Sequence, residues 1–257
     1  DHNCLQCESN GACELQDLIY RLGIEKPRFE IDPPGYATDN SNTMIFRDLN
    51  KCVLCGRCIR GCNEVQVNEV LDFAQRGNRM KVGPAFDTDY IDSACVFCGE
   101  CLQDCPTGAI INKQGRFQGR PWEVRKVRTT CTYCGVGCQL DLNVFNGKVV
   151  KTTSDRSYGT PNWGSLCVKG RFANEFIHSP DRLTSPLIRK NGKLEEASWD
   201  EALDFIAGKL KDIKAKHGPD SIGGLSSARA TNEDNYIFQK FMRAAVGTNN
   251  VDHCARL

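Results

Sequence analysis

"CVLCGRCIRGC", Cys52–Cys62, places four thiols within eleven residues, and "CVFCGECLQDC", Cys95–Cys105, repeats the arrangement. Both copies have the spacing C-x2-C-x2-C-x3-C, and Pro106 follows the second. Thiols held two residues apart do not pair easily with each other, because a disulfide needs a specific separation and orientation of its two cysteines. The identical spacing therefore indicates a metal cage that occurs twice.

The composition of the chain limits the alternatives. It has 257 residues, 16 cysteines and a formal net charge of +1. An even cysteine number also fits a disulfide-rich secreted protein, but a chain of this length can bury a core without cross-links, and its cysteines form four groups. The low net charge and short apolar runs predict no nucleic-acid partner and no membrane span. Reduced thiols without a signal peptide favour the cytoplasm, and the polar ends at Asp1 and Leu257 suggest a fragment.

The repeated run matches the two-cluster pattern of bacterial ferredoxins, in which the fourth cysteine of each run binds the other cluster. Three thiolates on a tight loop reach one cluster, whereas the fourth, expected at the start of the following helix, points away. Structural zinc instead uses two separated pairs of ligands. Gly56 and Gly99 fall where the loop must turn closely around the cluster. The resulting ligand sets are Cys52, Cys55, Cys58 and Cys105 for one cluster, and Cys95, Cys98, Cys101 and Cys62 for the other.

A third cysteine group begins the chain, in "DHNCLQCESNGACELQDL". Cys4, Cys7 and Cys13 need a fourth ligand, and His2 is near. The segment resembles the N-terminal module shared by iron-only hydrogenases, the large iron–sulfur subunit of complex I and formate dehydrogenases, where one histidine and three cysteines bind a [4Fe–4S] cluster. In that module three residues separate the histidine from the first cysteine, but here only Asn3 does. His2 as a ligand and His2 as a solvated terminal residue both stay open.

A fourth group has the spacing C-x2-C-x3-C-x28-C, with Cys131, Cys134, Cys138 and Cys167. Between them, "QLDLNVFNGKVVKT" predicts a hairpin with a type I′ turn at Asn146–Gly147. Zinc stays open on spacing alone. The arrangement resembles the [4Fe–4S] domain at the start of the molybdopterin oxidoreductases. The resemblance implies that Lys169 lies between this cluster and a pterin and relays electrons.

The last ninety or so residues have the composition of an α/β domain. Ser198 and Glu201 form a capping box before a helix whose apolar stripe, from Ala202 to Ile213, is expected to be core. "SIGGL", a loop and a helix from "NEDNY" to Val246 follow; Gly247 ends that helix. A strand, small-residue loop and helix N-terminus suit an anion.

The segments "SSARATNEDNY" and "GTNNVDHCAR" resemble the formate dehydrogenase branch of the molybdopterin enzymes. That resemblance implies that Arg229 contacts a pterin dinucleotide. It also implies that the molybdenum- or tungsten-binding cysteine or selenocysteine follows Leu257. Cys254 is therefore interpreted as a buried structural thiol.

These patterns predict a multidomain chain of the α+β or α/β class. The expected domains are a three-cysteine (plus histidine) [4Fe–4S] module at 1–35, a two-cluster ferredoxin-like domain at 36–115, a basic linker at 116–130, a molybdopterin oxidoreductase [4Fe–4S] domain at 131–185 and the start of the molybdopterin-binding domain at 186–257.

The resemblance implies a formate dehydrogenase or CO2 reductase catalytic subunit with four [4Fe–4S] clusters and a molybdenum or tungsten bis(molybdopterin guanine dinucleotide) centre. Many relatives carry a further [2Fe–2S] domain upstream. Expected partners are formate or CO2 and, in a hetero-oligomer, an NAD-reducing flavoprotein, a ferredoxin-like protein or a hydrogenase subunit. One alternative is a non-catalytic electron-transfer relative of the complex I large subunit. Another is an iron-only hydrogenase, but the segments "SWDEAL" and "SSARATNED" resemble pterin enzymes and disfavour it.

Overall fold

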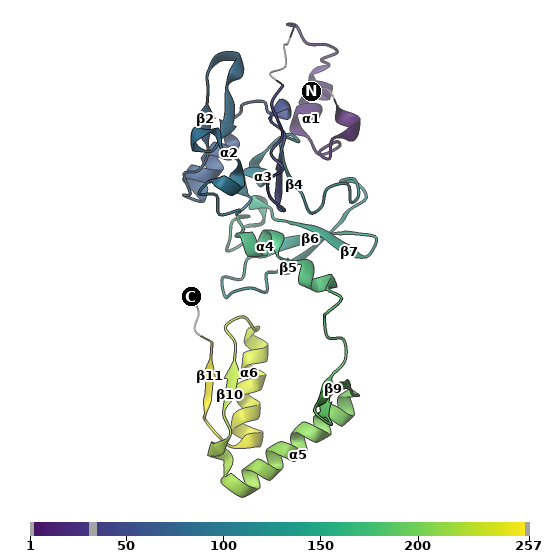
Figure 1. Ribbon diagram of the computed structural model, residues 1–257, viewed down its shortest axis with the longest axis vertical. Coiled ribbons are helices and arrows are strands. Elements are labelled where there is room, and N and C mark those ends of the chain that lie inside the picture. The colour runs from purple at the N-terminus through teal and green to yellow at the C-terminus, as the bar shows by residue number, and fades with distance from the viewer. Residues whose placement is uncertain (1–2, 31–34, 255–257) are drawn as a thin grey trace. The chain divides into compact units, whose positions relative to one another are not determined.

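The structure is a computed structural model that describes residues 3–30 and 35–254 (Figure 1). The chain divides into two compact units, one made of Asp1–Cys131 with Gly137–His178 and the other of Thr132–Val136 with Ser179–Leu257. Both contain helices and strands, as the predicted mixed class requires. In the described ranges, none of the helices has the length and apolar character of a membrane span.

The first unit contains short elements joined by long connections. Its helical segments are η1 (Cys4–Gln6), α1 (Glu14–Leu22), η2 (Leu49–Lys51), α2 (Arg57–Arg60), η3 (Gly61–Val65), η4 (Gly77–Arg79), η5 (Ala85–Asp87), η6 (Tyr90–Asp92), α3 (Glu100–Asp104), η7 (Arg156–Tyr158), α4 (Val168–Phe172) and η8 (Glu175–His178). Its strands are β1 (Ile45–Arg47), β2 (Asp72–Ala74), β3 (Lys81–Gly83), β4 (Ile110–Asn112), β5 (Arg125–Thr130), β6 (Gln139–Phe145) and β7 (Lys148–Thr153).

The second unit has fewer and longer helices. Its elements are β8 (Leu187–Lys190), β9 (Lys193–Glu196), α5 (Trp199–His217), η9 (Pro219–Ser221), β10 (Gly224–Ser226), α6 (Asn232–Lys240), η10 (Phe241–Val246) and β11 (Val251–His253). Strands β8 and β9 are antiparallel, whereas β10 and β11 are parallel and lie beside α6 in Figure 1.

The strands of the first unit form three antiparallel sheets. Strand β1 pairs with β4, β2 with β3, and β5 with β6 and β7 in a three-stranded sheet. The turn between β6 and β7 confirms the predicted type I′ hairpin, because Asn146 and Gly147 have φ values of 48° and 76°. A register shift at Asn143/Val144 interrupts the β6–β7 ladder.

The core of the first unit is built around motif cysteines. Cys58, Cys62 and Cys101 pack with buried apolar residues of the surrounding strands and loops, and Phe172 of α4 joins the same cluster. The segment after Cys167 therefore shares a core with the two cysteine repeats. The buried apolar members of the cluster are Ile45, Leu71, Val82, Tyr90, Ile110 and Phe172.

The basic segment expected to be a linker makes specific contacts and contributes β5. Arg116 pairs with Glu8, with Nε 2.8 Å from Oε1, and its guanidinium lies 3.8 Å from the centre of the Phe46 ring. Arg120 donates to the carbonyl oxygens of Cys7 at 3.0 Å and Leu5 at 2.7 Å. Residues 116–120 thus anchor the N-terminal cysteine loop.

Helix α5 begins and ends as its sequence predicts, but its apolar stripe is not core. The Ser198 hydroxyl accepts from the Glu201 amide, and Gly218 follows the last turn. Of the residues in α5 only Ala202 is buried, while Leu203 and Ile206 are 56% and 53% exposed. The expectation was wrong because the described part of the second unit supplies only two two-stranded sheets, which do not cover this face.

Candidate metal centres

The first cysteine repeat surrounds a narrow apolar cavity and receives its fourth thiol from the second repeat. Cys52, Cys55 and Cys58 line this cavity together with Cys105. Leu49, Val53, Val82 and Ile110 provide apolar walls.

The second repeat is arranged in the same way. Cys95, Cys98 and Cys101 line a second cavity with Cys62, beside Ile45, Val70, Leu71 and Tyr90. The structure therefore brings together the two crossed sets that the ferredoxin pattern predicts. The fourth cysteine of each repeat was expected at the start of a helix, and this expectation was wrong. Cys105 caps the C-terminal end of α3, and Cys62 lies in η3, a π-helical continuation of α2.

The two cysteine loops have nearly the same backbone geometry. The Leu54 amide donates to Cys52 Sγ at 3.4 Å, and the Phe97 amide donates to Cys95 Sγ at 3.4 Å. Leu54 and Phe97 have φ values of 54° and 53°, in the left-handed region that non-glycine residues rarely adopt. Such strain is common where a loop wraps closely around a ligand. The local repeat in sequence thus gives a repeat in structure, with amide donors aimed at sulfur.

Burial disfavours the thiolate form of several cysteines in these two sets. It raises the pKa of the Cys58 thiol to about 12, and the nearby sulfurs of Cys105, Cys52 and Cys55 add to the shift. Burial also raises the pKa of Cys101 well above its usual value. A coordinating metal deprotonates thiols outright. These sites therefore suit a positively charged, thiolate-binding group and disfavour four bare thiolates.

Polar groups beside the sulfurs also fit such a group. The Tyr90 hydroxyl lies 3.8 Å from Cys101 Sγ, and the Asn68 side-chain amide donates to Cys98 Sγ at 3.8 Å. Hydrogen bonds to sulfur help to tune iron–sulfur clusters. Among the described residues, no three His, Cys, Asp or Glu side chains converge on a point that would hold one metal ion. The cysteines of the two repeats and of the N-terminal set instead line cavities, and all sixteen cysteines are free thiols.

The N-terminal cysteines lie next to the first repeat. Cys4, Cys7 and Cys13 line one cavity of about 510 Å³, and Cys52 lines it as well. Gly108 allows this approach, since a Cβ there would lie 2.5 Å from Cys7 Sγ. His2, the candidate fourth ligand, lies outside the described residues.

Two cysteines of the fourth set, Cys131 and Cys167, lie at α4. The Cys131 amide donates to the Cys138 carbonyl oxygen at 2.8 Å, and a Cβ on Gly170 would lie 3.5 Å from Cys131 Sγ. Cys167 is the N-terminal cap of α4. Cys134 belongs to the short segment assigned to the second unit.

Comparisons with known families agree with this order of sites. Residues 1–28 match the NADH-ubiquinone oxidoreductase-G iron-sulfur binding region, and residues 51–109 match the 4Fe-4S dicluster domain. Residues 124–179 match the molybdopterin oxidoreductase Fe4S4 domain, and residues 182–257 match molybdopterin oxidoreductase itself. The chain belongs to the molybdopterin oxidoreductase family.

Two curated relatives within this family illustrate the range of names. The NADPH-Fe(3+) oxidoreductase subunit alpha of Geobacter sulfurreducens is 39% identical over 99% of this chain and 29% of the relative. A Staphylococcus aureus protein provisionally named a formate dehydrogenase is 34% identical over 98% of this chain and 30% of its own length. The chain thus spans less than a third of these relatives. A crystal structure of an NAD+-reducing [NiFe]-hydrogenase aligns with a TM-score of 0.43 and 29% identity, over 46% of this chain and 51% of that one.

The residues expected to contact a pterin in the molybdopterin oxidoreductases are exposed. Lys169 lies on α4, two positions after Cys167, with its side chain exposed. Arg229 lies in the loop between β10 and α6, where its amide donates to the Ser227 hydroxyl at 3.0 Å. Thr231 and Asp234 form a complete capping box at the start of α6. The strand, loop and helix predicted as an anion cradle are therefore present.

Cys254 is exposed, so the interpretation as a buried structural thiol was wrong. It follows β11 and lies 3.5 Å from the Ser227 hydroxyl that follows β10. This hydrogen bond, with the Ala228 amide and the Arg229 charge, lowers the pKa of the thiol. The parallel pairing of β10 and β11 places Cys254 and the Arg229 loop at the same end of the sheet.

The sequence alone did not reveal two buried charged residues beside the second cysteine repeat. Glu100 is fully buried, Arg171 is 1% exposed, and both lie beside the second repeat. A signal was present, because the residue after the loop glycine differs between the copies: Arg57 in the first and Glu100 in the second. A carboxylate between two cysteine ligands requires a counter-charge, and the sequence alone did not show where it came from.

The loop glycine of the second repeat is predicted to be irreplaceable. Gly99 has φ of 74°, and a Cβ there would lie 2.2 Å from Arg171 Cδ. Gly77 is a matched control, because its φ is 62° but its surroundings are open. We expect Gly77→Ala to lower the free energy of unfolding by ~1 kcal/mol, and Gly99→Ala by ~3 kcal/mol or more because overpacking adds to strain. Anaerobic urea unfolding of both variants checks this, and equal losses would contradict it.

Proposed function

We propose that this chain is part of the catalytic subunit of a formate dehydrogenase, which interconverts formate and CO2 at a molybdenum or tungsten bis-pterin centre. The observation that carries the proposal is the pair of crossed four-cysteine cavities, in the same unit as Cys131, Cys138 and Cys167. This arrangement precedes a segment of molybdopterin oxidoreductase sequence. An electron path next to a pterin domain suits a redox reaction that releases electrons in pairs.

The four cysteine sets would each hold one [4Fe–4S] cluster. When bound, a cluster accepts and releases one electron at a time, whereas oxidation of formate yields CO2, one proton and two electrons. The protein supplies buried walls and amide and hydroxyl donors to sulfur. Cys52 lines both its own cavity and the one beside Cys4, Cys7 and Cys13, which supports an electron path between these two sets.

The direction of this path follows from the position of α4. Cys167 caps α4 and Phe172 at its other end packs into the core formed around the two repeats. Electrons from the pterin centre would therefore enter at the Cys167 set, with Lys169 as the relay and Arg229 as a contact to the pterin dinucleotide. They would pass through the repeats to the N-terminal set. A partner subunit in a hetero-oligomer, linked to NAD(P), ferredoxin or hydrogenase, would accept them there.

An assay of the full-length protein tests this function. We expect formate-dependent reduction of a redox dye by protein that contains molybdenum or tungsten and extractable pterin. Lys169→Ala should lower the rate about 100-fold or more if it assists transfer as an electrostatic group, while Lys193→Ala, an exposed lysine of β9, should leave it unchanged. Full metal and pterin content without any formate activity would contradict the proposal.

A second candidate is an NADPH-linked oxidoreductase subunit that transfers electrons without formate chemistry. The identity of 39% to a Geobacter sulfurreducens NADPH-Fe(3+) oxidoreductase subunit favours it. The same dye assay distinguishes the two, with NADPH plus the partner subunits in place of formate. Dye reduction with NADPH only, by protein that lacks molybdenum and tungsten, would support this second candidate.

A further inference from the structure

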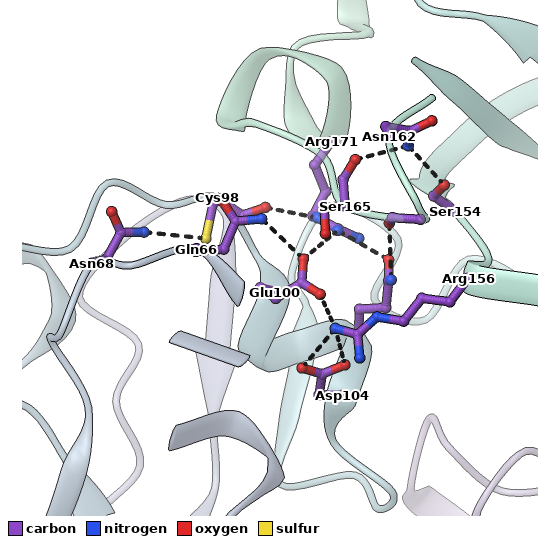
Figure 2. A network of polar contacts seen from close by, with 12 residues as sticks. Gln66, Asn68, Cys98, Glu100, Asp104, Ser154, Arg156, Asn162, Ser165 and Arg171 are labelled. Atoms are coloured by element: carbon purple, nitrogen blue, oxygen red, sulfur yellow. Dashed lines mark hydrogen bonds and ion pairs between the residues drawn. The ribbon is translucent and has the colours of Figure 1, made fainter. Parts of the chain in front are cut away.

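A buried arginine connects the Cys167 segment to the second cysteine repeat. Arg171 lies on α4, and its side chain is fully enclosed. Figure 2 shows Arg171 beside Cys98. Its Nε donates to the Cys98 carbonyl oxygen at 2.8 Å, and its Nη2 donates to Gln103 Oε1 at 3.0 Å. One side chain from α4 therefore holds the loop and the helix on which Cys98 and Cys101 lie.

Two carboxylates and a second arginine balance this charge. Glu100 is fully buried, with Oε2 4.0 Å from Arg171 Nη2, and it accepts from Gln66 Nε2 at 3.2 Å. Arg156 contacts Glu100 and also Asp104, at 2.8 Å from Oδ1 (Figure 2). Arg156 is half-exposed, so it is screened by solvent in a way that Arg171 is not.

Within the described part of the chain, one nitrogen of Arg171 lacks an acceptor. Nη1 is buried and has no hydrogen-bond partner among the described residues. A buried donor without a partner is unfavourable, and more so when it is charged. Burial lowers the pKa of Arg171, whereas Glu100 and the sulfurs of Cys98 and Cys101 raise it. A guanidinium stays protonated in proteins, so the positive charge is permanent. Four thiolates together with the cluster proposed here would carry a net negative charge, which would compensate it.

We infer that Arg171 is a positioning residue whose fixed charge raises the reduction potential of the cluster proposed at Cys62, Cys95, Cys98 and Cys101. The inference rests on the proposed cluster binding. Reduction adds one negative charge to this buried site, and a guanidinium nearby stabilises the reduced state more than the oxidised state. Glu100 carries the opposite sign and lines the cavity of this cysteine set, so its charge lowers the same potential.

Arg171 and Glu100 carry opposite charges, so removing each charge should shift the reduction potential in opposite directions. In the iron-loaded full chain, Arg171→Gln should lower the ratio of reduced to oxidised cluster about tenfold at a fixed potential, a shift of about 59 mV for one electron. Glu100→Gln should shift the ratio in the other direction. Arg171→Lys, which keeps the charge, should stay closer to the wild type than Arg171→Gln. Arg76→Gln, which removes an exposed arginine of the same unit, should shift nothing. Redox titration followed by electron paramagnetic resonance measures all four variants.

The outcomes separate this inference from the proposed function. Wild-type chain that binds no iron would overturn the cluster assignment itself. Iron-loaded variants with unchanged potentials, or Arg171→Gln and Glu100→Gln shifting the same way, would overturn only the role of Arg171. If Arg171→Gln does not fold, the comparison of Arg171→Lys, Glu100→Gln and wild type decides. Lysine at 171 should then retain the potential, and glutamine at 100 should raise it.

Discussion

Chelation of iron from the anaerobic, reduced chain is expected to unfold the region around α2 and α3. Three of the buried residues in its core are motif cysteines, and the sheets β1–β4 and β2–β3 have only two strands each. Two-stranded sheets are marginally stable alone. In such domains the binding free energy of the metal is folding free energy, on the order of 10 kcal/mol for structural sites.

Hydrogen exchange followed by mass spectrometry measures this effect. Peptides from β1, α2, α3 and β4 should lose protection when iron is removed. Peptides from α5 serve as the internal control, because α5 lies in the other unit, which holds only one motif cysteine. Equal protection of α2 and α3 with and without iron would show that apolar packing alone supports this fold.

Crossed ligation predicts a specific pattern in double variants. Cys105→Ser should remove the same cluster as Cys52→Ser, because both residues line one cavity. The double variant Cys52→Ser/Cys105→Ser should therefore lose no more iron than either single variant. By contrast, Cys95→Ser/Cys105→Ser should lose about twice as much, because Cys95 lines the other cavity. Residues that act as one unit are non-additive, whereas independent sites add.

Iron and acid-labile sulfide, measured on the anaerobic proteins, distinguish the two patterns. The mirror pair gives a matched control: Cys95→Ser/Cys62→Ser should also lose one cluster only. If Cys95→Ser/Cys105→Ser lost one cluster and Cys52→Ser/Cys105→Ser lost two, each repeat would bind its own four ligands, and the crossed arrangement would be wrong.

Local sequence rules predicted the parts of the fold that depend on short-range geometry. The turn at Asn146–Gly147 requires two residues with positive φ, and few dipeptides provide them. The caps at Ser198 and Thr231 depend on hydrogen bonds within one turn. The first three cysteines of each repeat lie on one short loop, so their grouping is also set locally. Each cavity is lined by such a triplet and by the fourth cysteine of the other repeat.

Features that depend on long-range packing were not predictable in the same way. The stripe of α5 has helical periodicity, but periodicity does not reveal whether another element covers it. The contacts of Arg120 with the Leu5 and Cys7 carbonyls join residues far apart in sequence, so a basic run resembled a linker. Arg171 was missed for the same reason, because its partners Cys98 and Gln103 lie 73 and 68 residues away in the sequence.

One measurement tests the central claim that the cysteine sets hold a series of [4Fe–4S] clusters. The chain is purified without air, its iron, acid-labile sulfide and zinc are quantified, and its paramagnetic resonance spectrum is recorded after reduction. We predict equal amounts of iron and sulfide, about one of each per motif cysteine, with signals from interacting reduced clusters. Stoichiometric zinc without sulfide, and no paramagnetic signal on reduction, would contradict the account.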